Sequence, residues 1–147
     1  MKTLLIAFAA ILIGYKSNAQ IETPVKWSYA AKKIAGSEYE VMIKANINPG
    51  WHIYSAYQKD GGPSKTEIVF NTKSLELSGK LKEPKPVTKF EKVYGIDVSY
   101  FEHEVIFSQR VRIKTIPMTI TGSTNFMVCN DQKCLFPEPV AFRIPVK

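Results

Sequence analysis

The sequence predicts an all-β domain folded as a β-sandwich of immunoglobulin-like type. Apolar and polar side chains alternate along many short segments, which is the period-two pattern of strands with one buried face. Turn-forming runs such as Asn48-Pro49-Gly50 and Gly61-Gly62-Pro63 separate these segments at intervals that suit a sandwich. Beyond the N-terminal apolar segment, no stretch shows helical periodicity with caps. The 147 residues contain no internal repeat and suffice for one domain with its own core.

The chain begins with the features of an export signal. Lys2 supplies a positive start, residues 4–13 form an unbroken apolar run, and Ser17-Asn18-Ala19 is a small-x-small cleavage site. The apolar run is too short to cross a bilayer as a helix, and no later segment is long and apolar enough to do so. We therefore expect a signal peptide over residues 1–19, an exported protein starting at Gln20, and a single domain over residues 20–147.

The charge of the chain does not indicate a nucleic-acid partner. Lys2 and Lys16 belong to the predicted signal, which leaves 18 of the 20 basic residues against 13 acidic ones, a net charge of +5. The lysines are scattered among glutamates, and no basic stripe is interleaved with aromatic residues. We interpret the surplus as a solvated surface and expect no nucleic-acid binding.

The predicted strands follow from the alternation, taken in chain order. Tyr39 to Ile47 alternate apolar and polar side chains up to the first turn, and the aromatic run WHIYSAY begins directly after it. Residues 82–90 contain Pro84 and Pro86, so they cannot form a central strand and are expected to be a long connection. Further strands are expected at residues 67–70, 75–81, 98–101, 105–113, 118–129 and 140–146.

Two cysteines, Cys129 and Cys134, are the only ones in the chain. The four polar residues 130–133 between them suit a hairpin turn, so the two strand ends come within disulfide range at one end of the sandwich, near the surface. In the strand ending at Cys129, Phe126 and Val128 share one face, and Met127 shares the other face with Cys129. By the chain-entropy model, a disulfide that closes so short a loop contributes roughly 2 kcal/mol to the free energy of unfolding, so it stabilises the fold only weakly.

Three interpretations of the cysteine pair remain open on the residues alone. The first is thiol–disulfide exchange, which needs a thiolate, an accessible sulfur and a second cysteine; Lys133 favours a thiolate and Asp131 disfavours it. The second is an inert hairpin disulfide in an exported binding or adaptor module. The third is a metal site, in which His52 and His103 would join the cysteines and Met127 would complete a copper(I) site.

The metal interpretation is the weakest of the three. His52 and His103 do not fall in paired ligand spacing, and each is expected to be a partly exposed strand residue. We therefore expect no metal and no cofactor. No nucleophile elbow, glycine-rich phosphate loop or defensible catalytic triad is present.

Three segments carry a resemblance to a known family. CNDQKCLFPEPVAF at residues 129–142, FEKVYGIDVSYFEHEVIFSQRV at residues 90–111 and GWHIY at residues 50–54 resemble the N-terminal periplasmic domain of the transmembrane thiol:disulfide interchange protein, the DsbD family. The resemblance extends over nearly the whole mature chain. It implies a periplasmic immunoglobulin-like domain whose cysteine pair shuttles electrons.

The resemblance also implies roles for individual residues. Cys134 corresponds to the cysteine that forms the mixed disulfide, and Cys129 to its resolving partner. Glu91, Val93 and Tyr94 fall where the family's cap loop covers the sulfurs, although Val93 stands where an aromatic side chain might be expected. Other residues expected near the disulfide or its cap are Phe90, Gly95, Tyr54 and Trp51, of which Trp51 is expected chiefly to pack in the core.

The partners implied are a thioredoxin-like or membrane-embedded electron donor and periplasmic acceptor proteins that contain disulfides. The acceptors would be isomerases or proteins that serve cytochrome c maturation. We expect the chain to lack the membrane-spanning and thioredoxin-like portions of the full-length family protein, because the sequence ends at Lys147. The resemblance therefore implies that electrons arrive from a separate protein.

Overall fold

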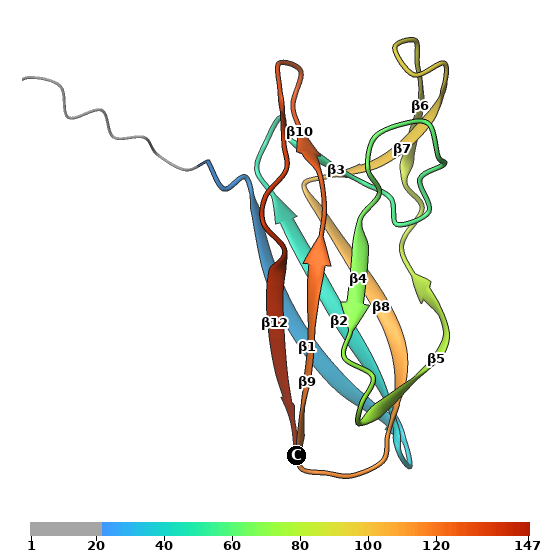
Figure 1. Ribbon diagram of the computed structural model, residues 1–147, viewed down its shortest axis with the longest axis vertical. Coiled ribbons are helices and arrows are strands. Elements are labelled where there is room, and N and C mark those ends of the chain that lie inside the picture. Colours follow the sequence, from blue (N-terminus) through green and yellow to red (C-terminus); the bar gives the residue numbers. More distant parts are fainter. Residues whose placement is uncertain (1–21) are drawn as a thin grey trace, which may run out of the picture.

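The computed structural model describes residues 22–147, which form antiparallel strands and no helix (Figure 1). The predicted signal peptide at residues 1–19 lies outside the described residues. Within residues 22–147 there is no helix that could span a membrane. The strands are β1 (Val25–Ala35), β2 (Glu38–Ile47), β3 (His52–Tyr54), β4 (Glu67–Phe70), β5 (Leu75–Lys82), β6 (Val87–Glu91), β7 (Ile96–Glu102), β8 (Glu104–Ile113), β9 (Met118–Asn125), β10 (Val128–Cys129), β11 (Cys134–Leu135) and β12 (Val140–Val146).

The strands form three sheets that pack as a β-sandwich. One layer has the order β1-β2-β8-β5, and the sheet β12-β9-β4 packs across the core from it (Figure 1). The third sheet, β11-β10-β3-β7-β6, lies at one end of the sandwich, from which the β6–β7 and β10–β11 hairpins project. The all-β sandwich predicted from the sequence is confirmed.

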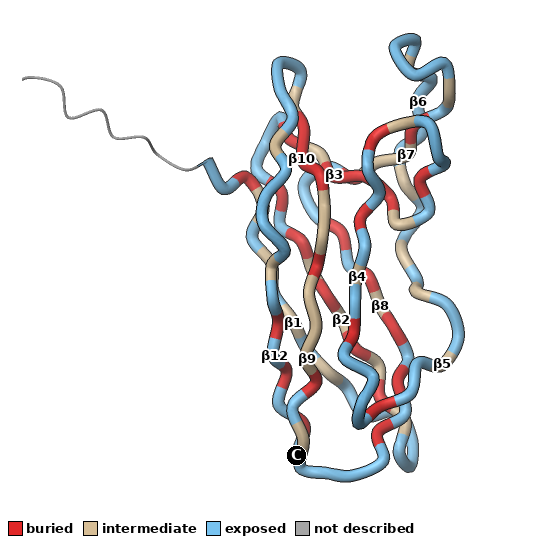
Figure 2. Tube along the Cα trace, viewed as in Figure 1, coloured by how far each residue is buried: buried red, intermediate tan, exposed pale blue. Residues whose placement is uncertain are grey.

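The core lies between the layers because alternate side chains of each strand point inward. In β2 and β8 buried and more exposed positions alternate almost without a break (Figure 2). Phe107 on β8 is fully buried and meets Phe101 of β7 edge to face, with ring centroids 5.9 Å apart. Tyr29 of β1 packs on Phe142 of β12 with ring centroids 5.2 Å apart. This contact joins the two layers where β1 and β12, the edge strands of their sheets, meet.

Two expected segments differ in the structure. The strand expected at residues 118–129 is interrupted, since β9 ends at Asn125 and β10 begins at Val128 in a different sheet. The expected connection at residues 82–90 is wrong in its second half, because β6 begins at Val87, directly after Pro86. β6 lies at the edge of its sheet, so the expectation that this segment is not a central strand holds.

The chain crosses between sheets at His103. This residue lies between β7 and β8 with φ of 61°, and its carbonyl accepts a hydrogen bond from the backbone N–H of Ile47 at 2.7 Å. His103 is therefore an exposed corner residue. The expectation that it lies within a strand is wrong. The corner directs β7 into the end sheet and β8 into the long one.

Candidate functional site

The two cysteines are bonded to each other across the β10–β11 hairpin. Cys129 and Cys134 are direct register partners with Cα atoms 4.1 Å apart. The turn between them is held by Asn130, whose side-chain Oδ1 accepts hydrogen bonds from the backbone N–H groups of Gln132 at 2.9 Å and Lys133 at 2.8 Å. The backbone N–H of Asn130 donates to the carbonyl of Lys133 at 2.9 Å. This local network sets the two sulfur-bearing residues opposite each other.

The two cysteines differ sharply in burial. Cys129 is 2% exposed, whereas Cys134 is exposed. Cys129 is buried because β10 lies between β11 and β3, and because its side chain packs with Tyr54, Val98 and Met127 in a small apolar cluster. Cys134 lies on β11, the edge strand of the sheet. The thiolate of another molecule can therefore reach Cys134 more easily than Cys129.

The end sheet presents one face to the core and the other to the disulfide. Val128, Ile53 and Phe101 are register partners on adjacent strands and are all buried in the main core. The neighbouring row points to the opposite face, because side chains alternate along each strand. That row consists of Cys134, Cys129, His52 and Glu102.

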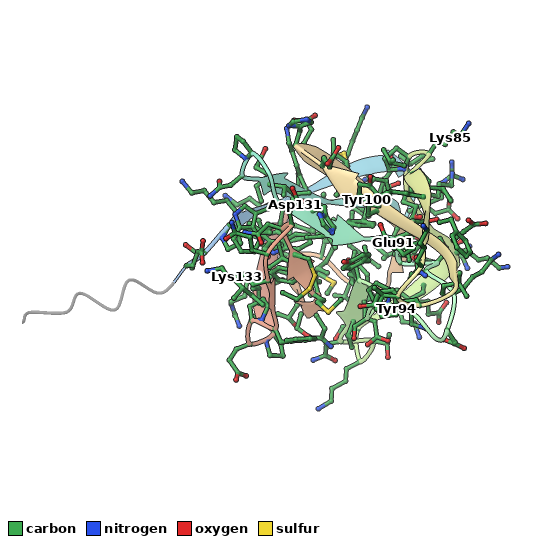
Figure 3. All side chains as sticks on the ribbon, turned by 90° about the horizontal axis from the view of Figure 1, so that it is seen from above. Lys85, Glu91, Tyr94, Tyr100, Asp131 and Lys133 are labelled. Carbon is green, nitrogen blue, oxygen red and sulfur yellow. A yellow bond between two sulfur atoms is a disulfide. The ribbon has the colours of Figure 1, made fainter. Side chains whose placement is uncertain are left out.

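A cavity of about 330 Å³ lies over this outer face, between the two projecting hairpins. Both cysteines bound it, together with His52 and Tyr54 from β3 and a wall from the β6–β7 hairpin. Seen from above, Glu91 and Tyr94 lie on the β6–β7 side of the disulfide, and Lys133 lies on the β10–β11 side (Figure 3). The cavity is also lined by Tyr100, Glu102, Val98 and Lys89.

The β6–β7 turn places only part of the expected cap at the cavity. The carbonyl of Glu91 accepts hydrogen bonds from the N–H groups of Tyr94 at 3.1 Å and Gly95 at 2.8 Å, and Gly95 has φ of 70°, which favours glycine. Glu91 and Tyr94 line the cavity, and Tyr94 is 43% exposed. Phe90 and Val93 are 57% and 88% exposed and do not line it.

The two aromatic residues expected beside the disulfide from the GWHIY segment lie on different faces. Tyr54 is buried, lines the cavity and packs with Cys129. Trp51 is buried in the main core, with the ammonium of Lys133 5.9 Å from its ring centroid.

The long loop after β3 holds this face in place. The N–H of Ser55 donates to the carbonyl of Ser99 at 2.9 Å, and the N–H of Ser99 donates to the side-chain oxygen of buried Gln58 at 2.7 Å. The hydroxyl of Thr66 donates to the carbonyl of Tyr54 at 2.6 Å. These bonds connect the loop after β3 to β3 and β7, which form the floor of the cavity.

The floor of the cavity holds two coupled polar aromatic groups. His52 Nε2 lies 3.1 Å from the hydroxyl of Tyr54, and its ring packs against that of Tyr100 at 5.1 Å between centroids. Burial raises the pKa of Tyr54 to about 12, with smaller contributions from Tyr94 and Glu91. Burial lowers the pKa of His52, against the opposing pull of Glu102, Asp131 and Glu91. At neutral pH the Tyr54 hydroxyl is therefore uncharged, and burial favours the neutral form of His52 beside it.

The residues of the metal interpretation are only partly brought together. His52 shares the cavity with the cysteines, but His103 does not line it. Among residues 22–147, no group of three or more His, Cys, Asp and Glu side chains is placed to hold a metal ion.

Sequence reasoning missed several residues of the cavity. Val98, Tyr100, Glu102 and Lys89 line it, and none had been proposed for the site. The strands β6 and β7 bring them there through the register of the end sheet. Alternation along residues 98–102 could have indicated three of these residues, because it places Val98, Tyr100 and Glu102 on one face of the strand.

Comparisons with known proteins find similar domains. The family model described as "Thiol:disulfide interchange protein DsbD, N-terminal" matches residues 14–144. No curated protein sequence matches the chain. Among solved structures, the N-terminal periplasmic domain of ScsB from Proteus mirabilis is similar, with a TM-score of 0.61 and 16% sequence identity. That match covers 85% of this chain and 47% of the ScsB chain, so this chain spans about half of its length.

Two structures from Neisseria meningitidis are also similar. The DsbD N-terminal domain in its reduced form has a TM-score of 0.51 and 15% identity, covering 80% of this chain and 83% of that one. The complex between the DsbD N-terminal and PilB N-terminal domains gives a TM-score of 0.53 at 15% identity, covering 86% and 87%. At these identities the likenesses establish the sandwich fold.

Proposed function

The chain belongs to the family of N-terminal domains of the thiol:disulfide interchange protein DsbD, and on this premise we propose that it relays electrons in the periplasm through Cys129 and Cys134. The observation that carries the proposal is the disulfide itself, which joins an exposed cysteine to a buried one at the rim of a cavity. Exchange needs one sulfur that a partner can reach and a second that can release the mixed disulfide. The pair supplies both.

The relay has two half-reactions. A thiolate of a donor dithiol attacks Cys134 Sγ, the Cys129–Cys134 bond breaks, and Cys129 leaves as a thiolate that takes a proton. The second donor thiol then attacks the mixed disulfide, which releases the oxidised donor and the dithiol form of this protein. In the second half-reaction, the Cys134 thiolate attacks an acceptor disulfide, and Cys129 attacks Cys134 Sγ to release the reduced acceptor.

The proposed partners follow from this chemistry. The donor is a thioredoxin-like or membrane-embedded dithiol protein, and the acceptors are periplasmic proteins with disulfides, such as isomerases or proteins of cytochrome c maturation. A complex between the DsbD N-terminal and PilB N-terminal domains of Neisseria meningitidis gives a precedent for a protein partner.

We assign the cavity wall a protective role within this relay. Cys129 lies beside Tyr54 in a buried cluster, and Tyr54 and Tyr94 line the same cavity as Cys129, so a nucleophile that approaches Cys129 Sγ from the cavity has to pass this wall. Shielding that side leaves Cys134 as the preferred point of attack. Of the remaining expected cap residues, Glu91 forms part of the wall, and Gly95 shapes the turn that carries Tyr94.

Trapping of mixed disulfides tests the relay. In a Cys129→Ser variant, Cys134 can form a mixed disulfide with a partner, but no second cysteine remains to release it. We expect this variant, expressed with its native envelope, to accumulate adducts that a reducing agent removes and that mass spectrometry maps to Cys134. The matched Cys134→Ser variant should accumulate few adducts, since Cys129 is buried.

The reduction potential separates the relay from an exported adaptor with an inert disulfide. A relay requires a potential near those of periplasmic exchange proteins, whereas a potential below about −300 mV marks a structural disulfide. A strongly negative potential together with no adducts on Cys134 would favour the adaptor.

A further inference from the structure

A row of four side chains crosses the outer face of the end sheet. Cys129 on β10 is the register partner of Cys134 on β11 and of His52 on β3. His52 is in turn the register partner of Glu102 on β7. Directly opposite residues on antiparallel strands point to the same face, with Cβ atoms about 4.5–5.5 Å apart. All four residues line the cavity of about 330 Å³, so the order across it is cysteine, cysteine, imidazole and carboxylate.

Cys129 has to lose a proton in the second half-reaction of the proposed relay. The acceptor is then joined to Cys134, and the Cys129 thiol must become a nucleophile to release it. Cys129 is 2% exposed and packs with Tyr54, Val98 and Met127. Such surroundings disfavour a thiolate, which is the nucleophilic form of cysteine. The step therefore gains from a proton acceptor that stands beside this sulfur inside the cavity.

His52 is held beside Cys129 as a base. Its Nε2 lies 3.1 Å from the Tyr54 hydroxyl, and its ring packs on those of Tyr54 and Tyr100 with centroids 5.3 Å and 5.1 Å apart. Burial lowers the pKa of His52, which favours the neutral imidazole that can accept a proton. The charge of Glu102 acts in the opposite direction and stabilises the imidazolium once it has formed.

The other groups around His52 are less suited to this task. The carboxylates of Glu91, Glu102 and Asp131 raise the pKa of His52, and Lys89 lowers it, all less strongly than burial does. Carboxylates are weak bases at neutral pH, and Tyr54 stays protonated with a pKa of about 12. The titratable and charged groups that share the cavity with His52 are Tyr54 of its own strand, Tyr100 and Glu102 of β7, Lys89, Glu91 and Tyr94 of the β6–β7 hairpin, and Cys129, Asp131 and Cys134 of the β10–β11 hairpin.

These observations deepen the proposed relay and rest on it: we propose that His52 accepts the proton of the Cys129 thiol when Cys129 attacks the mixed disulfide on Cys134. Tyr54 acts as a positioning residue, because its hydroxyl contacts Nε2 and its ring packs against the imidazole. Glu102 favours the imidazolium from the neighbouring strand. The arrangement is that of a nucleophile, its base and a third group that supports the base.

The step conserves atoms and electrons. The S–H proton of Cys129 passes to the imidazole of His52, and an electron pair of the sulfur forms the bond to Cys134 Sγ. The bond between Cys134 Sγ and the acceptor sulfur breaks, and its electron pair leaves with the acceptor as a thiolate. His52 then gives its proton to that thiolate or to solvent. The two cysteines are oxidised to the disulfide, and the acceptor is reduced by the two electrons they lose.

A chromogenic disulfide isolates this step. The reduced protein is mixed with an excess of dipyridyl disulfide, a small uncharged probe that releases one coloured thiopyridone in each exchange. The first release comes from attack by the exposed Cys134, and its rate depends on the probe concentration. The second release comes from attack by Cys129 on the mixed disulfide, so it is independent of the probe concentration. Stopped-flow absorbance measures both phases over a series of pH values.

The pH profile of the second phase is the test. With His52 as the base, the rate should stay nearly constant from about pH 8 down to below about pH 6.5, the ordinary pKa of histidine, because burial lowers the pKa of this one. In a His52→Gln variant the rate at about pH 7 should be at least about tenfold lower. It should also fall about tenfold per unit of pH, since only the thiolate present in solution equilibrium then reacts. The first phase should be unchanged, which shows that the variant is folded.

Two further variants complete the experiment. Glu102→Gln should keep the constant region and move its acid edge to lower pH, because a charge that favours the imidazolium is lost. His103→Asn is the matched control, since it removes the other histidine of the sequence, which does not line the cavity. Asparagine tolerates the φ of 61° at this position, and both phases should match those of the unsubstituted protein.

The outcomes separate this inference from the relay. A second phase in His52→Gln that is unchanged, or slower with the constant region retained, would overturn the role of His52 and leave the relay standing. If replacement of His52 also alters the first phase, the Glu102→Gln variant decides, and an unmoved acid edge overturns the role. If the unsubstituted protein shows no second phase, Cys129 does not release the mixed disulfide, and the relay fails together with the inference.

Discussion

At the scale of single residues, the disulfide has two chemically different ends. Cys134 is exposed on an edge strand, and Cys129 is buried among Tyr54, Val98 and Met127. A nucleophile that reaches Cys129 must pass the cavity wall, to which Tyr94 contributes its partly exposed ring. In the proposed relay, these surroundings favour attack on Cys134 over attack on Cys129.

Truncation of Tyr94 tests that selection. In a Tyr94→Ala variant the cavity side opens, so reduced glutathione should cleave the disulfide at least about twofold faster, and a larger share of glutathione should attach to Cys129. Rapid acid quench followed by peptide mapping measures both quantities. Val93→Ala is the matched control, because Val93 lies in the same turn and does not line the cavity. An unchanged rate and an unchanged Cys134 preference would remove Tyr94 from the shield.

The site residues divide by how much the sequence could say about them. The spacing and polar turn of Cys129 and Cys134 predicted the hairpin. The resemblance to the family predicted a cap of Glu91, Val93 and Tyr94, and of these Glu91 and Tyr94 line the cavity. Tyr54, an aromatic residue expected near the disulfide, lines it as well. Tyr100 was missed because it reaches the cavity through pairing of β3 with β7, strands separated by more than forty residues. Local alternation gives the face of a side chain but not its neighbouring strand.

At the scale of elements, the β10–β11 hairpin carries both cysteines of the disulfide. Its sequence predicted the turn, because four polar residues between two strand ends are typical of a hairpin. The break at residues 126–127 was not predicted, since the alternation continues across it while the chain passes from one sheet to another. The consequence of the break is that β10 joins the end sheet beside β3 and places Cys129 over the cavity floor.

The Asn130 side chain organises this hairpin and should influence the redox equilibrium. Its Oδ1 holds two backbone N–H groups of the turn, so an Asn130→Ala variant should let the reduced hairpin fray. Closing the disulfide would then require additional ordering. If the free energy of disulfide formation becomes less favourable by about 1 kcal/mol, the reduction potential becomes less negative by about 20 mV.

Equilibration with glutathione buffers measures this shift, and hydrogen exchange of the reduced hairpin reports the fraying. Gln132→Ala is the matched control, since Gln132 lies in the same turn and contributes its backbone N–H, which the substitution keeps. A shift of equal size in both variants would mean that the Asn130 side chain does not pre-order the thiols.

At the scale of the whole molecule, the main core and the small cluster around Cys129 are separate. The main core joins β2 and β8 to β9 and β12, whereas Cys129 belongs to a small cluster on the outer face of the end sheet. Alternation predicted most core strands because burial is periodic along each of them. The order of strands in the three sheets was beyond such reasoning, because it depends on pairings between distant segments.

This separation predicts that the domain stays folded through its redox cycle. The disulfide closes a loop with a sequence separation of 5, so its reduction should lower the free energy of unfolding by only about 2 kcal/mol. Urea unfolding of the oxidised and reduced protein, followed by tryptophan fluorescence, measures the difference. A Cys129→Ala, Cys134→Ala variant should unfold cooperatively and with a similar m-value, since the main core is intact. Loss of a cooperative transition on reduction would instead mean that the disulfide holds the sandwich together, and a protein that unfolds whenever it is reduced could not serve as a repeated carrier of electrons.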